Sequence, residues 1–289
     1  MLRNKSRARL FFLAPGVTWI LLFTLFPLLY SLFLSFTNWR LGRNASFIAL
    51  ENYRRIFSDV RVGETVVTTV FLSVGGLLLT LVFGTFVAWL FNHDLPGIRR
   101  LRSVLTMPLF AAPIALGFLG KVIFNETDGP VNTMITSLGG TGVPWLIHPL
   151  WARVAVLLLD VWQWTPFVFI VILAAMQSIS DELYEAGRLD TSSAWQLFRH
   201  ITLPLIAPAL GTVALLRLVE TFKILDIPLS FTGGGPGSAT QTYSYYTFIT
   251  GLRNFDLGYA SSLAYLLVIL AIIISSIYFW RVRERFNVE

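Results

Sequence analysis

One group of polar residues in this sequence of 289 residues falls inside a long apolar run, where polar groups are costly. The group comprises Asp160, Gln163 and Trp164. A carboxylate and an amide can hydrogen-bond a polar ligand, and an indole offers a flat apolar face. We therefore predict that these side chains contact a ligand. The open alternative places Asp160 at a membrane interface and the indoles in an aromatic belt, an assignment we favour for Trp162.

A second group recurs at three-residue spacing on one helical face: Arg217, Glu220 and Lys223. These residues could line a ligand path, or Glu220 could neutralise its two neighbours so that their burial is tolerable. We assign Arg217 to the structural role and keep Glu220 and Lys223 as candidate ligand contacts.

The motifs of several enzyme classes are missing from the sequence. Neither Lys121 nor Lys223 lies in a nucleotide-binding loop, and the three histidines are isolated from one another. Cysteine does not occur, which excludes disulfides and thiol nucleophiles. We predict no catalytic residue, no metal site and no enzyme activity for this chain. If ATP drives the protein, another chain must supply it.

The composition indicates a membrane protein. Hydrophobic residues make up 55% and charged residues only 13%, with a mean hydropathy of +0.68. A soluble domain of this length would carry about 25% charged residues. Lipid must therefore solvate part of the apolar surface.

Six uncharged or nearly uncharged runs predict six membrane-spanning helices in one all-α domain covering residues 1–289. Their approximate bounds are 10–36, 65–92, 103–124, 153–180, 201–224 and 257–280.

The distribution of basic residues predicts that both termini are cytoplasmic. With that orientation, twelve Lys and Arg residues lie inside and six outside. The net charge of +6 is then an orientation signal, and no nucleic-acid partner is needed to explain it. The segment 38–64 is unusually basic for an outer loop, and we expect a short surface helix in it at Phe47–Phe57.

The cytoplasmic loop at about 181–200 has an unusual content. Ser180 and the cluster 190–193 are potential helix caps, which predicts two short helices with a bend between them. Trp195, Phe198 and Ile201 recur at helical spacing and form an apolar face. Such a loop could insert into a groove of another protein or lie on the membrane surface.

This loop resembles the "EAA" loop of ABC-importer permeases, with matching spacing throughout. The residues at the pattern's positions are Glu185, Ala186, Gly187, Asp190, Ile201, Leu203 and Pro204. The sequence departs from the pattern at Gly187, where the family has alanine, and at 191–192, where Thr-Ser replaces Gly-Ala. Further matches to the carbohydrate, polyol and glycerol-phosphate branch occur at Pro27–Phe36, Phe47–Tyr53, Thr232–Pro236 and Phe255–Ala260.

The resemblance implies a type I permease fold and an assembly in a bacterial or archaeal cytoplasmic membrane. The partners would be a second, similar permease, two ATPase subunits that bind ATP and Mg, and an extracytoplasmic solute-binding protein. The chain itself would bind no cofactor. Its loop would couple transport to the ATPase, and substrate contacts would include Asp160, Gln163 and Trp164, where the side chains suit a sugar.

Two other functions remain as alternatives. An ion-coupled secondary transporter would work alone and would show paired broken helices in two matching halves, which the sequence lacks. A polytopic membrane enzyme would need a catalytic cluster at one membrane face, and the polar groups do not converge by spacing.

Overall fold

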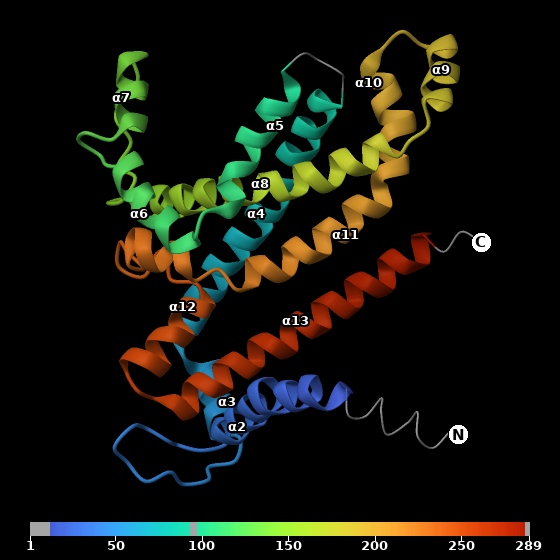
Figure 1. The fold of residues 1–289 in the computed structure, drawn as a ribbon. Coiled ribbons are helices and arrows are strands. Elements are labelled where there is room, and N and C mark those ends of the chain that lie inside the picture. The colour runs from blue at the N-terminus through green and yellow to red at the C-terminus, as the bar shows by residue number, and fades with distance from the viewer. Residues whose placement is uncertain (1–11, 93–96, 287–289) are drawn as a thin grey trace, which may run out of the picture. The chain divides into compact units, whose positions relative to one another are not determined.

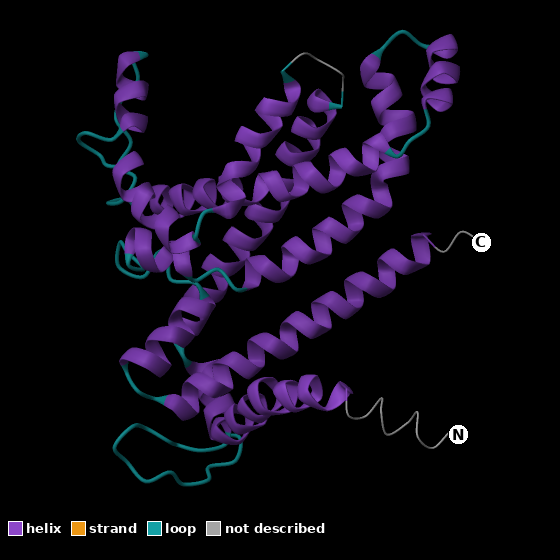
Figure 2. Ribbon diagram, in the orientation of Figure 1, coloured by secondary structure: helices purple, strands orange, loops and turns teal. Residues whose placement is uncertain are grey.

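The computed structural model describes residues 12–92 and 97–286, and all regular elements in those ranges are helical (Figure 1, Figure 2). Five helical segments are long and apolar enough to cross a membrane, which confirms a multi-pass all-α protein. They are Phe12–Ser35, Val60–Phe91, Pro149–Gln177, Ala194–Phe222 and Leu257–Arg281.

The helices follow one another with short connections, and η denotes a 3₁₀ or π-helical turn. In chain order they are η1 (Leu21–Leu25), α2 (Phe26–Ser35), α3 (Glu51–Ser58), α4 (Val60–Phe91), α5 (Ile98–Thr106), η2 (Met107–Phe110), α6 (Pro113–Ile123), α7 (Pro130–Ser137), α8 (Pro149–Gln177), α9 (Asp181–Asp190), α10 (Ala194–Leu197), η3 (Phe198–Thr202), α11 (Leu203–Phe222), η4 (Pro228–Thr232), α12 (Tyr243–Phe248), η5 (Ile249–Arg253) and α13 (Leu257–Phe286).

The span predicted at 103–124 is broken. Its two halves, Arg100–Phe110 and Pro113–Ile123, meet at 103°. Pro113 opens the second half, and Ala112 before it has an extended backbone. A proline disfavours the helical conformation in the residue before it, and its fixed φ suits the first position of a new helix. The structure thus contains six spans if this bent pair counts as one.

The contacts divide the chain into two compact units, Met1–Val60 with Tyr246–Leu270 and Arg61–Tyr245 with Ala271–Glu289. The single domain predicted for residues 1–289 stays a prediction. Orientation also stays a prediction, and four of the twelve basic residues behind it, Arg3, Lys5, Arg7 and Arg9, lie outside the described residues.

The first unit compensates the charges of the basic segment 38–64. Asp256 forms ion pairs with Arg40 at 2.7 Å and with Arg55 at 3.1 Å. The Asp59 carboxylate accepts hydrogen bonds from the hydroxyls of Tyr246 and Tyr259, each at 2.8 Å. Burial, followed by the adjacent Asp59, raises the pKa of Tyr246 to about 12, so this hydroxyl remains a donor. The helix expected at 47–57 is present as α3, from Glu51 to Ser58.

The second unit is organised around α8. In its most apolar stretch 61% of the residues are buried, the largest share among the five spans. One side-chain cluster includes Leu72, Val156 and Phe231, and another includes Val168 and Ile206. The other spans leave most of their apolar side chains exposed, as expected where lipid is the solvent. Helix α8 therefore holds α4 and α11 together.

Helix α4 approaches α8 closely at Gly84, and this contact yields a stability prediction. A Cβ atom at Gly84 would lie 2.5 Å from the Val168 Cβ and 3.2 Å from the Phe169 backbone nitrogen, whereas one at Gly63 would meet nothing within 4 Å. We expect Gly84→Ala to destabilise the protein by about 1–3 kcal/mol through overpacking. Gly63→Ala, in the same helix, should be neutral or stabilising by up to about 1 kcal/mol. Thermal unfolding in detergent measures both, and equal melting temperatures for the two variants would contradict the prediction.

Candidate functional site

A cavity of about 250 Å³ in the second unit brings together all five residues predicted to contact a ligand. It is lined by Pro113, Asp160, Gln163, Trp164, Glu220, Lys223, Ile224, Leu225, Asp226 and Ile227. The residues at 160, 163 and 164 share one face of α8, since positions three and four apart are neighbours on a helix. Glu220 is in the last turn of α11, and the residues from Lys223 to Ile227 follow its end. The site is thus built where two packed spans meet the segment after α11.

Asp160 and Arg217 form an ion pair beneath this cavity, with side-chain exposures of 3% and 0%. The guanidinium also lies over the Trp164 ring, 5.0 Å from its centroid. Asp160 is therefore a residue of the protein interior that binds Arg217, and the alternative that placed it at a membrane interface stays a prediction. Arg217 has the structural role predicted for it, but its partner is Asp160 on α8, whereas the sequence analysis offered only Glu220.

Helix α4 leaves room for this ion pair at Gly76. A Cβ atom there would lie 2.8 Å from Asp160 Oδ2 and 3.2 Å from Arg217 Nη2. Any larger residue would push against two buried charged groups. Three helices thus meet at one buried pair of charges.

Gln163 retains an unpaired acceptor. Its Nε2 donates to the carbonyl oxygen of Ala111, at the break of the bent span, over 3.0 Å. Its Oε1 is buried and has no partner among the described residues, and the same is true of Arg217 Nε and Nη1. A buried polar atom without a partner costs about 1–3 kcal/mol.

Glu220 and Lys223 pair with each other at 2.7 Å at the exposed rim, with side-chain exposures of 38% and 58%. Sequence analysis missed Asp226, which also lines the cavity and whose carboxylate bonds to no described residue. The three-residue spacing of 217, 220 and 223 continues to 226, and that signal could have found it. Trp162, assigned to a membrane-facing belt, is 48% exposed and does not line this cavity.

The loop between α8 and α11 forms two short helices with a bend, as predicted. Helix α9 covers Asp181–Asp190 and α10 covers Ala194–Leu197. The Ser193 hydroxyl accepts a hydrogen bond from the backbone N–H of Gln196. Ser180 occupies the N-cap position of α9 but makes no side-chain hydrogen bond there. Figure 1 shows both helices at the end of the unit where α8 finishes and α11 begins.

Helix α9 is fixed against the turn η3. The Tyr184 hydroxyl hydrogen-bonds the Thr202 hydroxyl at 2.9 Å. A Cβ at Gly187 would lie 2.5 Å from Ile201 Cδ1 and 2.8 Å from Leu197 Cδ2, so this small residue permits the close approach. Thr191, which stands where the EAA pattern has glycine, has an extended backbone (φ −154°) that any residue adopts.

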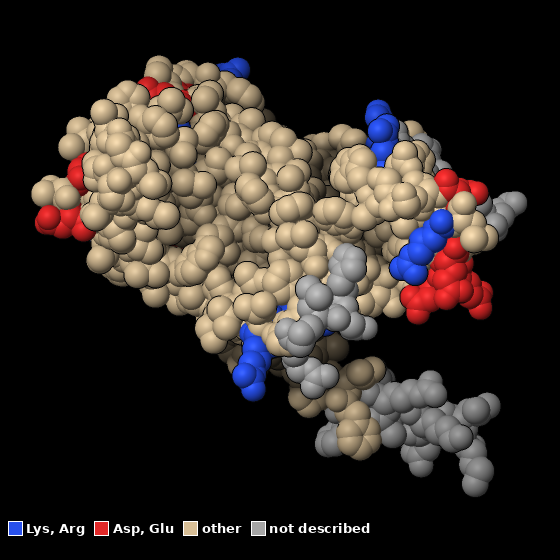
Figure 3. Space-filling view, turned by 90° about the horizontal axis from the view of Figure 1, so that it is seen from above, with Lys and Arg blue, Asp and Glu red and all other residues tan. Residues whose placement is uncertain are grey.

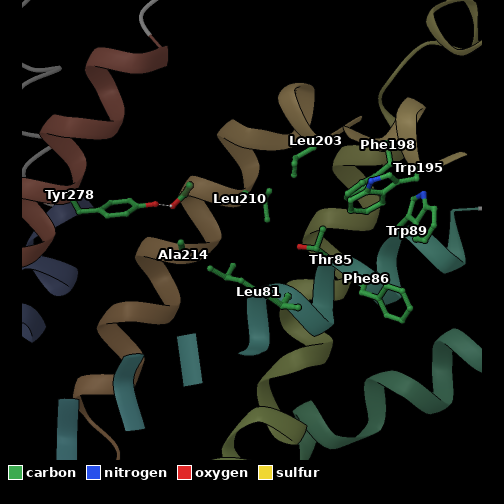
Figure 4. A pocket seen from close by; sticks show the side chains of 12 residues that line it. Leu81, Thr85, Phe86, Trp89, Trp195, Phe198, Leu203, Leu210, Ala214 and Tyr278 are labelled. Atoms are coloured by element: carbon green, nitrogen blue, oxygen red, sulfur yellow. Dashed lines mark hydrogen bonds between the residues drawn. The ribbon is translucent and has the colours of Figure 1, made fainter. Parts of the chain in front are cut away.

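The apolar face of the loop packs on its own chain. The Trp89 ring of α4 lies 5.5 Å from the Phe198 ring and 6.5 Å from the Trp195 ring (Figure 4). These residues line an apolar cavity of about 530 Å³, which Leu203 also lines. The structure therefore directs much of this face inward and leaves another face of the loop exposed.

The exposed part of the loop includes α9 and, on α10, the side chain of Trp195, which is 58% exposed. Glu185, Ala186 and Asp190 are exposed, and Leu189 is exposed to 89%. Gly187 and Ile201 are half-buried at the α9–η3 contact, and Pro204 is exposed near the start of α11. Figure 3 shows a largely uncharged surface with acidic and basic side chains gathered at the end where Figure 1 places α9 and α10.

Comparisons with known proteins agree on one family. A model described as "Binding-protein-dependent transport system inner membrane component" matches residues 23–284. The sulfoquinovosyl glycerol transport system permease protein of Agrobacterium fabrum is 32% identical, over 94% of this chain and 89% of the relative. The trehalose/maltose transport system permease protein of Thermococcus litoralis is 31% identical, over 89% of this chain and 88% of the relative.

A solved structure of a bacterial alginate ABC transporter, in complex with an alginate pentasaccharide-bound periplasmic protein, contains a chain of the same fold. The TM-score is 0.87 with 21% sequence identity, over 99% of this chain and 98% of the other. At this identity the likeness shows the fold, which is the predicted type I permease fold.

The buried ion pair yields a prediction about the interior of the spans. Asp160→Asn or Arg217→Gln alone leaves one charge buried without a counter-charge, and each should destabilise the protein by about 3–5 kcal/mol. The double variant Asp160→Leu with Arg217→Met removes both charges and should be more stable than either single variant. Glu220→Gln at the exposed pair is the control, with an expected cost of at most about 1 kcal/mol. Thermal unfolding in detergent measures all four, and a double variant less stable than both singles would contradict the prediction.

Proposed function

This chain belongs to the family of binding-protein-dependent transport system inner membrane components, and we propose that it is the membrane-spanning subunit of an ATP-driven sugar importer. The observation that carries the proposal is the exposed helix α9, with Glu185, Ala186 and Gly187 at the family's loop positions, fixed rigidly between two spans. The rest of the proposal follows from what such a helix and the polar cavity are able to do.

The cavity supports a sugar as the transported molecule. Sugars present many hydroxyls and a flat apolar ring face, and the cavity offers carboxylates and the Trp164 indole. Among these groups, Gln163, Trp164, Glu220 and Lys223 are free to act as substrate contacts. Asp160 contributes indirectly by holding Arg217 against Trp164. Two relatives carry names that specify sugars, an uncharged disaccharide for one and a sulfonated sugar glycerol for the other, so the names agree with a sugar and leave its charge class open.

Helix α9 supports coupling to a separate ATPase. Its exposed side chains include the acidic Glu182 and Glu185, the basic Arg188 and the apolar Leu189, a mixture suited to a groove of another protein. The helix begins four residues after α8 ends and rests on η3, which runs directly into α11. When ATP binding moves the groove, α9 would carry both spans with it, and the cavity would change its side of access.

The assembly would contain the partners that the resemblance implies. They are a second, similar permease, two ATPase subunits that bind ATP and Mg, and an extracytoplasmic solute-binding protein, in a bacterial or archaeal cytoplasmic membrane. This chain would bind no cofactor, and hydrolysis of ATP would take place on the ATPase subunits.

Affinity purification of the tagged chain from its native membrane tests the proposed function. The expected result is stoichiometric recovery of an ATPase and a second permease, with ATP-dependent sugar uptake after reconstitution with the solute-binding protein. Recovery of the chain alone, with uptake driven by an ion gradient, would support the secondary transporter and overturn the proposal.

Charge reversal in α9 tests the coupling role of the loop. Glu185→Lys should reduce ATP-driven uptake at least about tenfold, because one unfavourable charge contact costs more than about 1.4 kcal/mol in a partly buried groove. Membrane insertion and thermal stability should stay unchanged, since Glu185 is exposed and forms no ion pair within the described chain.

Two matched variants complete this experiment. Glu51→Lys makes the same charge reversal on exposed helix α3, across the membrane by the predicted topology, and should retain uptake. Gly187→Ala restores the family residue and meets only flexible side-chain ends, so it should also retain uptake. Normal uptake by Glu185→Lys would refute the assignment of α9.

A further inference from the structure

The charges that line the cavity do not balance. Asp160 is neutralised by Arg217 directly beneath the cavity, and Glu220 is neutralised by Lys223 at the rim. These two pairs account for four of the five charged groups at the site. The fifth is Asp226, whose carboxylate forms no ion pair and no hydrogen bond with any described residue.

Asp226 is fixed in place by its backbone. Its carbonyl oxygen accepts the Ser230 hydroxyl at 2.7 Å, in the turn that connects α11 to η4. The residue is half-buried and lines the same cavity as Gln163 and Trp164. Its negative charge is therefore held at the cavity wall, where the partly apolar surroundings screen it less than bulk water would.

A single uncompensated charge matters in a space of about 250 Å³, because any occupant lies within a few ångströms of the wall. A neutral polyol can donate hydroxyl hydrogens to Asp226. A ligand with its own carboxylate, phosphate or sulfonate would meet repulsion at Asp226. Of its potential positive partners, Arg217 is buried against Asp160, and Lys223 could be reached only by displacing the Glu220 carboxylate, which would remain beside the ligand anion.

We propose that this cavity selects uncharged sugars or polyols over anionic ones, and that Asp226 is the specificity-determining residue. The proposal rests on the proposed transport function and makes it more specific by naming the charge class of the substrate. Removal of the Asp226 charge should relax the selection without disturbing the buried pair at Asp160 and Arg217.

The absence of cysteine from the chain permits a test that needs no knowledge of the natural substrate. Leu225→Cys introduces one thiol at the cavity wall, beside Asp226. The importer complex is treated with anionic sulfonatoethyl methanethiosulfonate or cationic trimethylammonioethyl methanethiosulfonate, and labelling of this chain is followed by its mass. A neutral methanethiosulfonate measures access to the thiol.

The cationic reagent should label Leu225→Cys faster than the anionic one, and adding Asp226→Asn should lower the ratio of the two rates about tenfold. Glu51→Gln, which removes an exposed acidic group on α3 outside the cavity, should leave the ratio unchanged. The same comparison at Pro113→Cys, on α6, provides a second reporter if Leu225→Cys fails to assemble.

Two results would overturn the proposal: a ratio that does not respond to Asp226→Asn, or a thiol that the neutral reagent cannot reach at either position. Neither result would affect the proposed function, because co-purification with an ATPase and ATP-driven uptake are measured separately. Conversely, if uptake proved to be driven by an ion gradient, the proposed function would be wrong, but the labelling ratio would be unchanged.

Discussion

The ion pair between Asp160 and Arg217 is the constraint on which the second unit depends. Its members lie on different spans and are almost completely buried. Each charge alone would cost several kcal/mol in such surroundings, so neither helix can rotate or withdraw without exposing the other's charge to an apolar interior. The pair requires Gly76 on α4 for space and places a guanidinium over Trp164. One interaction therefore fixes the register of α8 and α11 and the orientation of one cavity wall.

The same two spans carry the loop that we assign to the ATPase contact. Asp160 lies seventeen residues before the end of α8, and Arg217 fourteen residues after the start of α11, which correspond to about 25 Å and 21 Å of helix. Helix α9 is tied to η3 through Tyr184 and Gly187, and η3 continues into α11. Under the proposed function, a displacement of α9 reaches the cavity through two rigid helices that a buried ion pair holds together. On the α11 side the chain is helical without a break from η3 to Arg217.

The spans and the loop were predictable from sequence because each depends on signals within one segment. Apolar runs located five spans, and the serine-rich cluster before Ala194 located the break between α9 and α10. The bend at Ala112 was missed because the uncharged run continues through it. That run predicted one straight span, although Pro113 disfavours a helical conformation in the residue before it. Helical spacing grouped Arg217 with Glu220, but it cannot show that the residue facing Arg217 is Asp160, on another helix. Asp226 was missed, although the spacing of 217, 220 and 223 continues to it, because the predicted span ended at 224.

The two ion pairs at the cavity differ in the free energy needed to break them. The exposed pair of Glu220 and Lys223 contributes at most about 1 kcal/mol, so ligand hydroxyls can replace it without loss of structure. Separation of Asp160 from Arg217 would cost several times more, because both side chains are buried and each would be left without its partner. A ligand can therefore exchange partners at the rim while the interior stays fixed. Since Asp226 has no partner to exchange, its charge acts on every ligand that enters, and the wall of the cavity remains negative whether or not the rim pair is broken.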